Sequence, residues 1–255
     1  MTLMAMLLLG FFLGMRHATD SDHVVAVSAI VSRERTPSAG LKIGALWGLG
    51  HTATILIVGG AVVLFGWVIP PRIGLSLEMS VAVMLIALGA MNLSGALVRI
   101  TKHEHGHSHA HGHAHGLRRS KARFTRRVAQ RGFVKRELAP SRARLRGSLR
   151  PLVIGVVHGL AGSAAIALLV LSSIKSSGAA LAYLAVFGVG TVLGMMLITL
   201  AISFPISLLS RRFENAEQLM ARATGVLSVA FGLFLMYRIG IVDGLFFGAT
   251  TWLPR

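Results

Sequence analysis

Apolar residues fill six long stretches of the chain, and polar or turn-forming residues separate them. The six stretches are residues 3–31, 43–69, 77–100, 152–174, 179–209 and 219–241. Each is long enough to cross a bilayer as a helix, which takes about 20 mostly apolar residues. The pattern predicts an all-α membrane protein with six transmembrane helices.

The two halves of the chain share glycines at matching places. Gly14, Gly48 and Gly89 align with Gly155, Gly188 and Gly232, at offsets of 141, 140 and 143 residues. Because each half has three spans, the halves would insert with opposite orientation, which is the inverted-repeat plan of many transporters. We therefore expect a first three-helix repeat (1–100), a His-rich and Arg-rich cytoplasmic loop (101–149), a second three-helix repeat (150–241) and a C-terminal tail (242–255).

Positive charge lies on alternate loops. The first, third and fifth loops hold 21 of the 26 lysines and arginines, and 15 of these lie between Arg99 and Arg150. Cytoplasmic loops carry such an excess. The distribution places the termini away from the cytoplasm in the cell membrane, with residues 101–149 inside. It also assigns the net charge of +17 to membrane topology and lipid contact rather than to nucleic-acid binding.

Composition excludes several classes of protein. The mean hydropathy is +0.70 and only 14% of residues are charged, whereas soluble domains have about 25%. The chain has no cysteine, so it has no disulfide and no thiolate metal site. It also lacks a phosphate-binding glycine loop followed by lysine. The chain is expected to be neither an ATPase nor any other enzyme.

The first apolar stretch contains an unusual group of polar residues: Arg16, His17, Asp20, Asp22 and His23. Ionisable groups inside a membrane are costly and mark function by default. Imidazole with carboxylate favours borderline divalent metals over Ca²⁺ or Mg²⁺. The sequence leaves open a buried ion-pair cluster with Arg16, or a proton relay, in place of a metal site.

Helix geometry limits what this segment can bind alone. On a straight helix His17, Asp20 and His23 share one stripe, while Asp22 points about 100° away. The segment must either unwind near Gly14 or share its ion with other helices. Two further histidines lie inside spans, His51 in the second and His158 in the fourth. The predicted metal ligands are His17, Asp20, Asp22, His23, His51 and His158.

The third loop begins with a low-complexity run in which histidines alternate with small residues. Such runs bind Ni²⁺, Co²⁺, Zn²⁺ and Cu²⁺ with little selectivity. We expect an auxiliary metal-binding loop made of His103, His105, His107, His109, His111, His113 and His115.

The segment from Arg16 to His23 resembles the signature of the nickel/cobalt transporter family, a histidine, four residues and then Asp-His in an early membrane helix. Residues 49–52, Leu-Gly-His-Thr, are similar to that family's second motif. The resemblance implies a ligand role for His17, Asp22 and His23, and a site role for His51. Residues 160–165 lack the acidic motif of classical members. The chain looks more like the shorter six-helix branch, which includes nickel/cobalt efflux and urease-accessory-like membrane proteins.

The sequence thus favours a membrane transporter of a divalent transition metal, Ni²⁺ or Co²⁺, which would be cargo rather than a permanently bound cofactor. Its expected partners are the lipid bilayer, the metal ion and a cytosolic metallochaperone. Two alternatives stay open. One is a membrane-embedded metal sensor or accessory scaffold that passes metal to a cytosolic partner. The other is a proton-coupled exporter of an organic solute, in which the His/Asp cluster serves protons only.

Overall fold

A computed structural model describes residues 2–94, 142–161 and 174–250, except for residues 33, 35, 68, 175, 214, 215 and 249. Within these ranges the chain is helical and forms no strand, which confirms the all-α class. The helices are α1 (Leu3–His17), α2 (Ser21–Val31), α3 (Pro37–Phe65), α4 (Pro71–Leu93), α7 (Arg142–Leu160), α9 (Ser177–Arg212) and α10 (Ala216–Tyr237), and α10 continues into a π-helical turn, η1 (Arg238–Val242).

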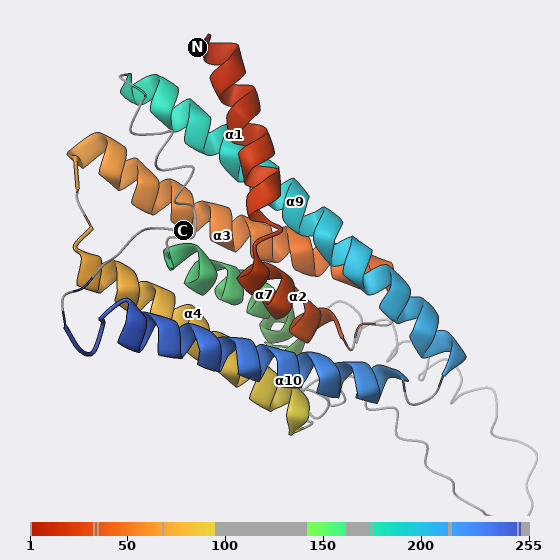
Figure 1. Ribbon diagram of the computed structural model, residues 1–255. Coiled ribbons are helices and arrows are strands. Elements are labelled where there is room, and N and C mark those ends of the chain that lie inside the picture. The colour runs from red at the N-terminus through yellow and green to blue at the C-terminus, as the bar shows by residue number, and fades with distance from the viewer. Residues whose placement is uncertain are drawn as a thin grey trace, which may run out of the picture. The chain divides into compact units, whose positions relative to one another are not determined.

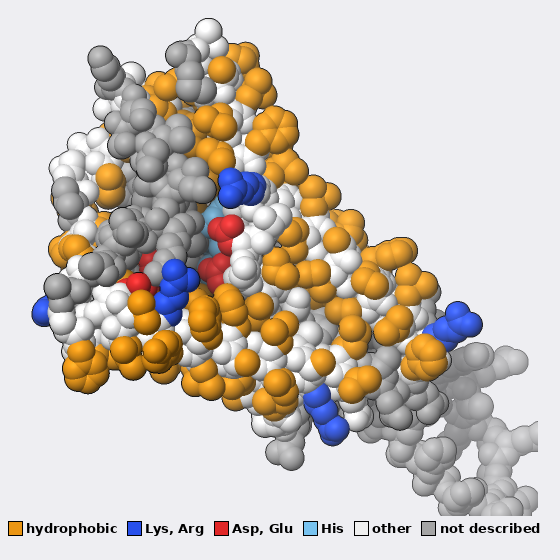
Figure 2. Space-filling view, viewed as in Figure 1, with side chains coloured by type: hydrophobic (Ala, Val, Ile, Leu, Met, Phe, Trp, Pro, Cys, Tyr) orange, Lys and Arg blue, Asp and Glu red, His pale blue; other side chains and the backbone are white. Residues whose placement is uncertain are grey.

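Four segments of the described chain are long and apolar enough to cross a membrane. They are Pro37–Phe65, Pro71–Leu93, Ser177–Leu209 and Glu217–Val242. Hydrophobic side chains cover the outward faces of these helices, as lipid contact requires (Figure 2). Three shorter apolar helices are also present, Leu3–His17, Ser21–Val31 and Leu149–Leu160.

The first predicted span is two helices rather than one. Ala18, Thr19 and Asp20 separate α1 from α2. The Thr19 hydroxyl donates to the Arg16 carbonyl at 2.6 Å, and Asp20 has an extended backbone with ψ of 145°. The backbone N–H groups of Thr19 and Asp20 donate to carbonyls three residues back, on Arg16 and His17, so the i→i−4 ladder of the helix ends here. The break lies four residues beyond Gly14.

Hydroxyl side chains begin three of the helices. Thr2, Thr36 and Ser176 accept hydrogen bonds from the backbone N–H three residues later, at 3.4–3.5 Å. An N-cap of this kind satisfies one of the amide groups that a helix start leaves without a partner. In α3 a proline at the first helical position reinforces the start.

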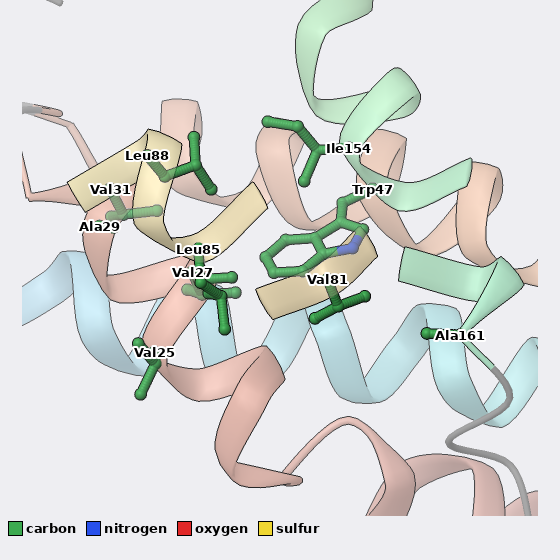
Figure 3. Close-up of a cluster of buried hydrophobic side chains, with 11 residues drawn as sticks. Val25, Val27, Ala29, Val31, Trp47, Val81, Leu85, Leu88, Ile154 and Ala161 are labelled. Atoms are coloured by element: carbon green, nitrogen blue, oxygen red, sulfur yellow. The ribbon is translucent and has the colours of Figure 1, made fainter. Parts of the chain in front are cut away.

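The helices pack mainly between the two halves of the sequence. Helix α9 lies along both α1 and α3, and α4 lies along α10 (Figure 1). The half-helix α2 lies among them and contacts α3, α4, α9 and α10. One buried apolar cluster joins α2, α3, α4 and α7 through residues such as Val27, Trp47, Leu85 and Ile154 (Figure 3).

Glycines bring the helix backbones into direct contact, and they do so in matched pairs. A Cβ on each of these glycines would meet backbone of the facing helix, so only hydrogen fits there. Gly14 contacts Phe187, and the equivalent contact in the other half is that of Gly155 with Trp47. In the same way, the contact of Gly190 with Phe11 is equivalent to that of Gly50 with Leu152, and the contact of Gly89 with Gly225 is equivalent to that of Gly232 with Ala82. Within each pair the residues differ by the offsets seen in the sequence. The same offsets therefore relate both the glycines and the residues that they touch.

Candidate metal site

Four buried histidines from four helices meet at the break between α1 and α2. His17 ends α1, His23 lies in the first turn of α2, His51 is in the middle of α3 and His158 is near the end of α7. Their exposed fractions are between 0% and 6%. Ring centroids are 4.1 Å apart for His23 and His158, and 4.7 Å apart for His17 and His23. A cluster of imidazoles this compact is a candidate metal centre.

His17 links the edge of the cluster to its interior. Its Nδ1 donates to Asp20 Oδ2 at 2.7 Å, and its Nε2 lies 3.0 Å from His51 Nε2. Two imidazole nitrogens bound to one ion at about 2.1 Å each would be about 3.0–3.4 Å apart. The spacing of His17 and His51 is therefore close to what a shared ion needs. Asp20 itself is 42% exposed and orients His17 from the rim.

Asp22 holds the other two imidazoles. Its Oδ2 accepts from His158 Nε2 at 2.8 Å, and its Oδ1 accepts from His23 Nδ1 at 3.1 Å and from the His23 backbone N–H at 3.0 Å. Asp22 also lies in the first turn of α2, where a negative charge is favoured by the helix dipole. A carboxylate that accepts from the far nitrogen of an imidazole fixes its tautomer and leaves the near nitrogen to bind metal.

Three ring nitrogens of the cluster are buried and have no hydrogen-bond partner: His23 Nε2, His51 Nδ1 and His158 Nδ1. Buried polar atoms in proteins are nearly always satisfied. Asp22 accepts from the other ring nitrogen of His23 and of His158, so His23 Nε2 and His158 Nδ1 carry lone pairs that a divalent transition metal can take.

Two overlapping groups can each hold an ion. His17, His23 and His51 form one, and Asp22, His23 and His158 form the other; in each, one ligand atom per residue lies within 4.8 Å of the rest. His23 belongs to both. Because they share His23 and lie inside the same cluster, each group marks a candidate position for a cation.

The structure brings together all six ligands predicted within the spans, but in two roles. His17, Asp22, His23, His51 and His158 occur in the two ligand groups, whereas Asp20 contacts only His17 at the rim. Across the described part of the chain, no ion pair joins Arg16 to either aspartate, and both carboxylates pair with histidines instead. The predicted loop ligands, His103 to His115, lie outside the described residues.

Sequence reasoning overlooked two aromatic residues beside the cluster. The Phe187 ring lies 5.7 Å from His17, and the Trp47 ring lies 5.6 Å from His158 and 6.1 Å from His23. A signal was present in the repeat, since 187 and 47 differ by the offset of 140 that aligns α9 with α3.

Comparison with known proteins gives two matches. A sequence model of the family described as NicO, high-affinity nickel-transport protein, matches residues 3–237. The urease accessory protein UreH of Bacillus sp. (strain TB-90) is 37% identical over 246 residues, which cover 96% of each chain. No solved structure matches. The chain therefore belongs to the NicO nickel-transport family, and it is a multi-pass membrane protein with a nickel-related role rather than an enzyme.

Proposed function

We propose that the protein carries Ni²⁺ or Co²⁺ across the cell membrane through the buried His/Asp cluster. The observation that supports this most is the meeting of four buried histidines and Asp22 at the break between two half-helices. Broken helices that carry polar groups at mid-membrane are typical of transporter binding sites. Ligands contributed by separate helices can be rearranged by a relative movement of those helices.

The proposed carrier has six crossings built as two inverted repeats. Helices α1 and α2 together form the first crossing, and α7 begins the fourth. The matched glycine contacts support the repeat, because they are what an approximate two-fold axis in the membrane plane would generate. His17 and His158 correspond under the same offset, so the cluster lies where the repeats meet.

The charge distribution supports an orientation with both termini away from the cytoplasm and the long third loop inside. In this arrangement the His-rich run faces the cytosol. There it would act as a local buffer for the transported ion and a contact point for a cytosolic metallochaperone.

Ion flux tests the proposal. Purified protein in liposomes loaded with a Ni²⁺-sensitive dye should admit Ni²⁺, and His23→Ala should reduce the initial rate at least about tenfold, because both ligand groups lose a member. Phe204→Ala, which removes an exposed side chain outside the cluster, is the control and should leave the rate unchanged. Binding of Ni²⁺ without any flux would refute transport.

A second candidate is an accessory scaffold that passes nickel to a cytosolic partner. The name of the relative, urease accessory protein, favours it, as does the His-rich run. The same liposomes discriminate the two functions. A scaffold predicts no flux but predicts transfer of bound Ni²⁺ to a soluble metallochaperone, and loss of that transfer when residues 102–116 are deleted.

A further inference from the structure

We propose that Trp47 and Phe187 are a pair of gating residues that close the buried His/Asp cluster from its two opposite sides. The inference rests on the proposed transport function. It assigns a role in transport to two side chains that are not themselves ligands.

The two residues occupy equivalent positions in the two halves. Trp47 lies one turn before His51 in α3, and Phe187 lies one turn before Thr191 in α9. Equivalent glycines touch their backbones, since Gly155 packs on the Trp47 carbonyl and Gly14 packs on the Phe187 carbonyl. Both aromatic residues are buried, with exposed fractions of 0% and 2%.

The two helices that carry these residues are antiparallel. Gly48 of α3 contacts Val192 of α9, whereas Gly59, further along α3, contacts Leu184, which is earlier in α9. A step toward the start of α3 therefore runs in the opposite direction to a step toward the start of α9. Since Gly48 faces Val192, Trp47 lies level with residue 193 of α9, six residues beyond Phe187. At a rise of about 1.5 Å per residue, Trp47 and Phe187 lie about 9 Å apart along the helix axes.

Each ring contacts a different part of the cluster. Phe187 contacts His17, which belongs to the three-histidine group. Trp47 contacts His23 and His158, which belong to the group that contains Asp22. An ion that moved along the helices through both positions would pass one ring on the way in and the other on the way out.

The chemistry of the rings suits closure. A hydrated divalent ion cannot cross an apolar contact, and hydrophobic constrictions gate by excluding water. Trp47 packs against Ile154 and Val81, which complete an apolar seal (Figure 3). Its indole N–H is buried without a partner. The closed position of Trp47 therefore leaves a donor unsatisfied, and a swing toward water would satisfy it.

Site accessibility can be read with a single cysteine, because the chain has none of its own. Thr191 is a suitable reporter position, since it is fully buried and lies between the levels of Trp47 and Phe187 on α9. Thr191→Cys would be treated with a membrane-impermeant thiol reagent in right-side-out and in inverted vesicles. A separate Ser38→Cys variant, at an exposed position beside the start of α3, establishes which side that end faces.

The reporter alone should react slowly from both sides. Adding Trp47→Ala should accelerate labelling about tenfold from the side of the α3 start only, and adding Phe187→Ala should do so from the other side only. The milder Trp47→Leu and Phe187→Leu give the same test if an alanine variant fails to fold. Trp67→Ala and Phe204→Ala, which remove exposed rings, are matched controls and should change neither rate.

Three outcomes would overturn the proposal: fast labelling of the reporter alone, acceleration from the same side by both substitutions, or acceleration by neither. The result is separate from that for transport. If each substitution accelerates labelling from one side only but the protein moves no Ni²⁺, the two gating residues are supported and the transport proposal is refuted. If the protein moves Ni²⁺ but labelling is not accelerated from one side only, transport is supported and the gating proposal is refuted.

Discussion

At the scale of single residues, the site is a set of imidazoles held by two carboxylates. The sequence predicted these residues as candidates, because ionisable groups in an apolar stretch mark function by default, and the structure brings them together. The different contacts of the two aspartates were not predictable. Asp22 reaches two histidines of the interior, whereas Asp20 stays at the rim with one. Only the direction of the backbone after the break decides between these two roles.

Asp20 is expected to act by orienting His17. Asp20→Ala should weaken Ni²⁺ binding about tenfold, as loss of a carboxylate partner of a metal-binding histidine does elsewhere. Asp20→Asn keeps an acceptor for His17 Nδ1 and should cost less. Isothermal titration of the detergent-solubilised protein measures both. Equal losses in the two variants would indicate that Asp20 binds the ion directly.

Glu34, in the connection between α2 and α3, carries a testable pH dependence. Burial raises the pKa of Glu34 above its ordinary value of 4.5, and the negative charge of Glu217 raises it further. A group whose pKa is raised by folding favours the folded state below pH 4.5 and loses that contribution as the pH rises through the folded value. Glu34→Gln should therefore raise the unfolding temperature at pH 7.5, and the gain should shrink toward pH 4.5. Thermal unfolding in detergent at a series of pH values checks this, and a gain that is constant with pH would contradict it.

At the scale of helices, the main feature is the break in the first span. The sequence predicted either unwinding near Gly14 or an ion shared with other helices. In the structure Gly14 lies at a close helix crossing, where a Cβ would meet the backbone of Phe187 and Thr191. The helix ends instead at His17, and the N–H groups of Thr19 and Asp20 that follow donate to carbonyls only three residues back. A glycine in an apolar helix has two uses, bending and close packing, and only the partner helix tells them apart.

Gly14→Ala should destabilise the crossing of α1 and α9. The new Cβ would meet the Phe187 carbonyl and the Thr191 backbone nitrogen, neither of which can move independently of α9. Overpacking of this kind costs about 1–3 kcal/mol. Gly60→Ala is the matched control in α3, because its Cβ would meet only Leu181 Cδ2 at 3.9 Å. Alanine there should be neutral or stabilising, since it is the better helix former. Equal unfolding temperatures for the two variants would argue against a close crossing.

At the scale of the whole molecule, the two halves depend on each other. Helices α1 and α3 of the first half pack on α9 of the second, and α4 packs on α10. The sequence predicted a repeat from three glycine matches, and the contacts of these glycines follow the same offsets. The interlocking could not be predicted, because an offset says which residues are equivalent and not which ones touch.

This interlocking predicts how the chain responds to being cut. Residues 1–100 or 150–255 expressed alone would leave the glycine faces of α1, α3 and α4, or of α9 and α10, without their partners. Each half should therefore be degraded or aggregate in the membrane. Co-expressed halves should assemble, because their contacts are between helices and do not need the covalent loop from 101 to 149. Co-purification of the second half with a tagged first half measures assembly, and Ni²⁺ binding to the purified pair tests whether His158 has joined His17, His23 and His51. A first half that bound Ni²⁺ with full affinity alone would show that His158 is dispensable and that the cluster belongs to one repeat.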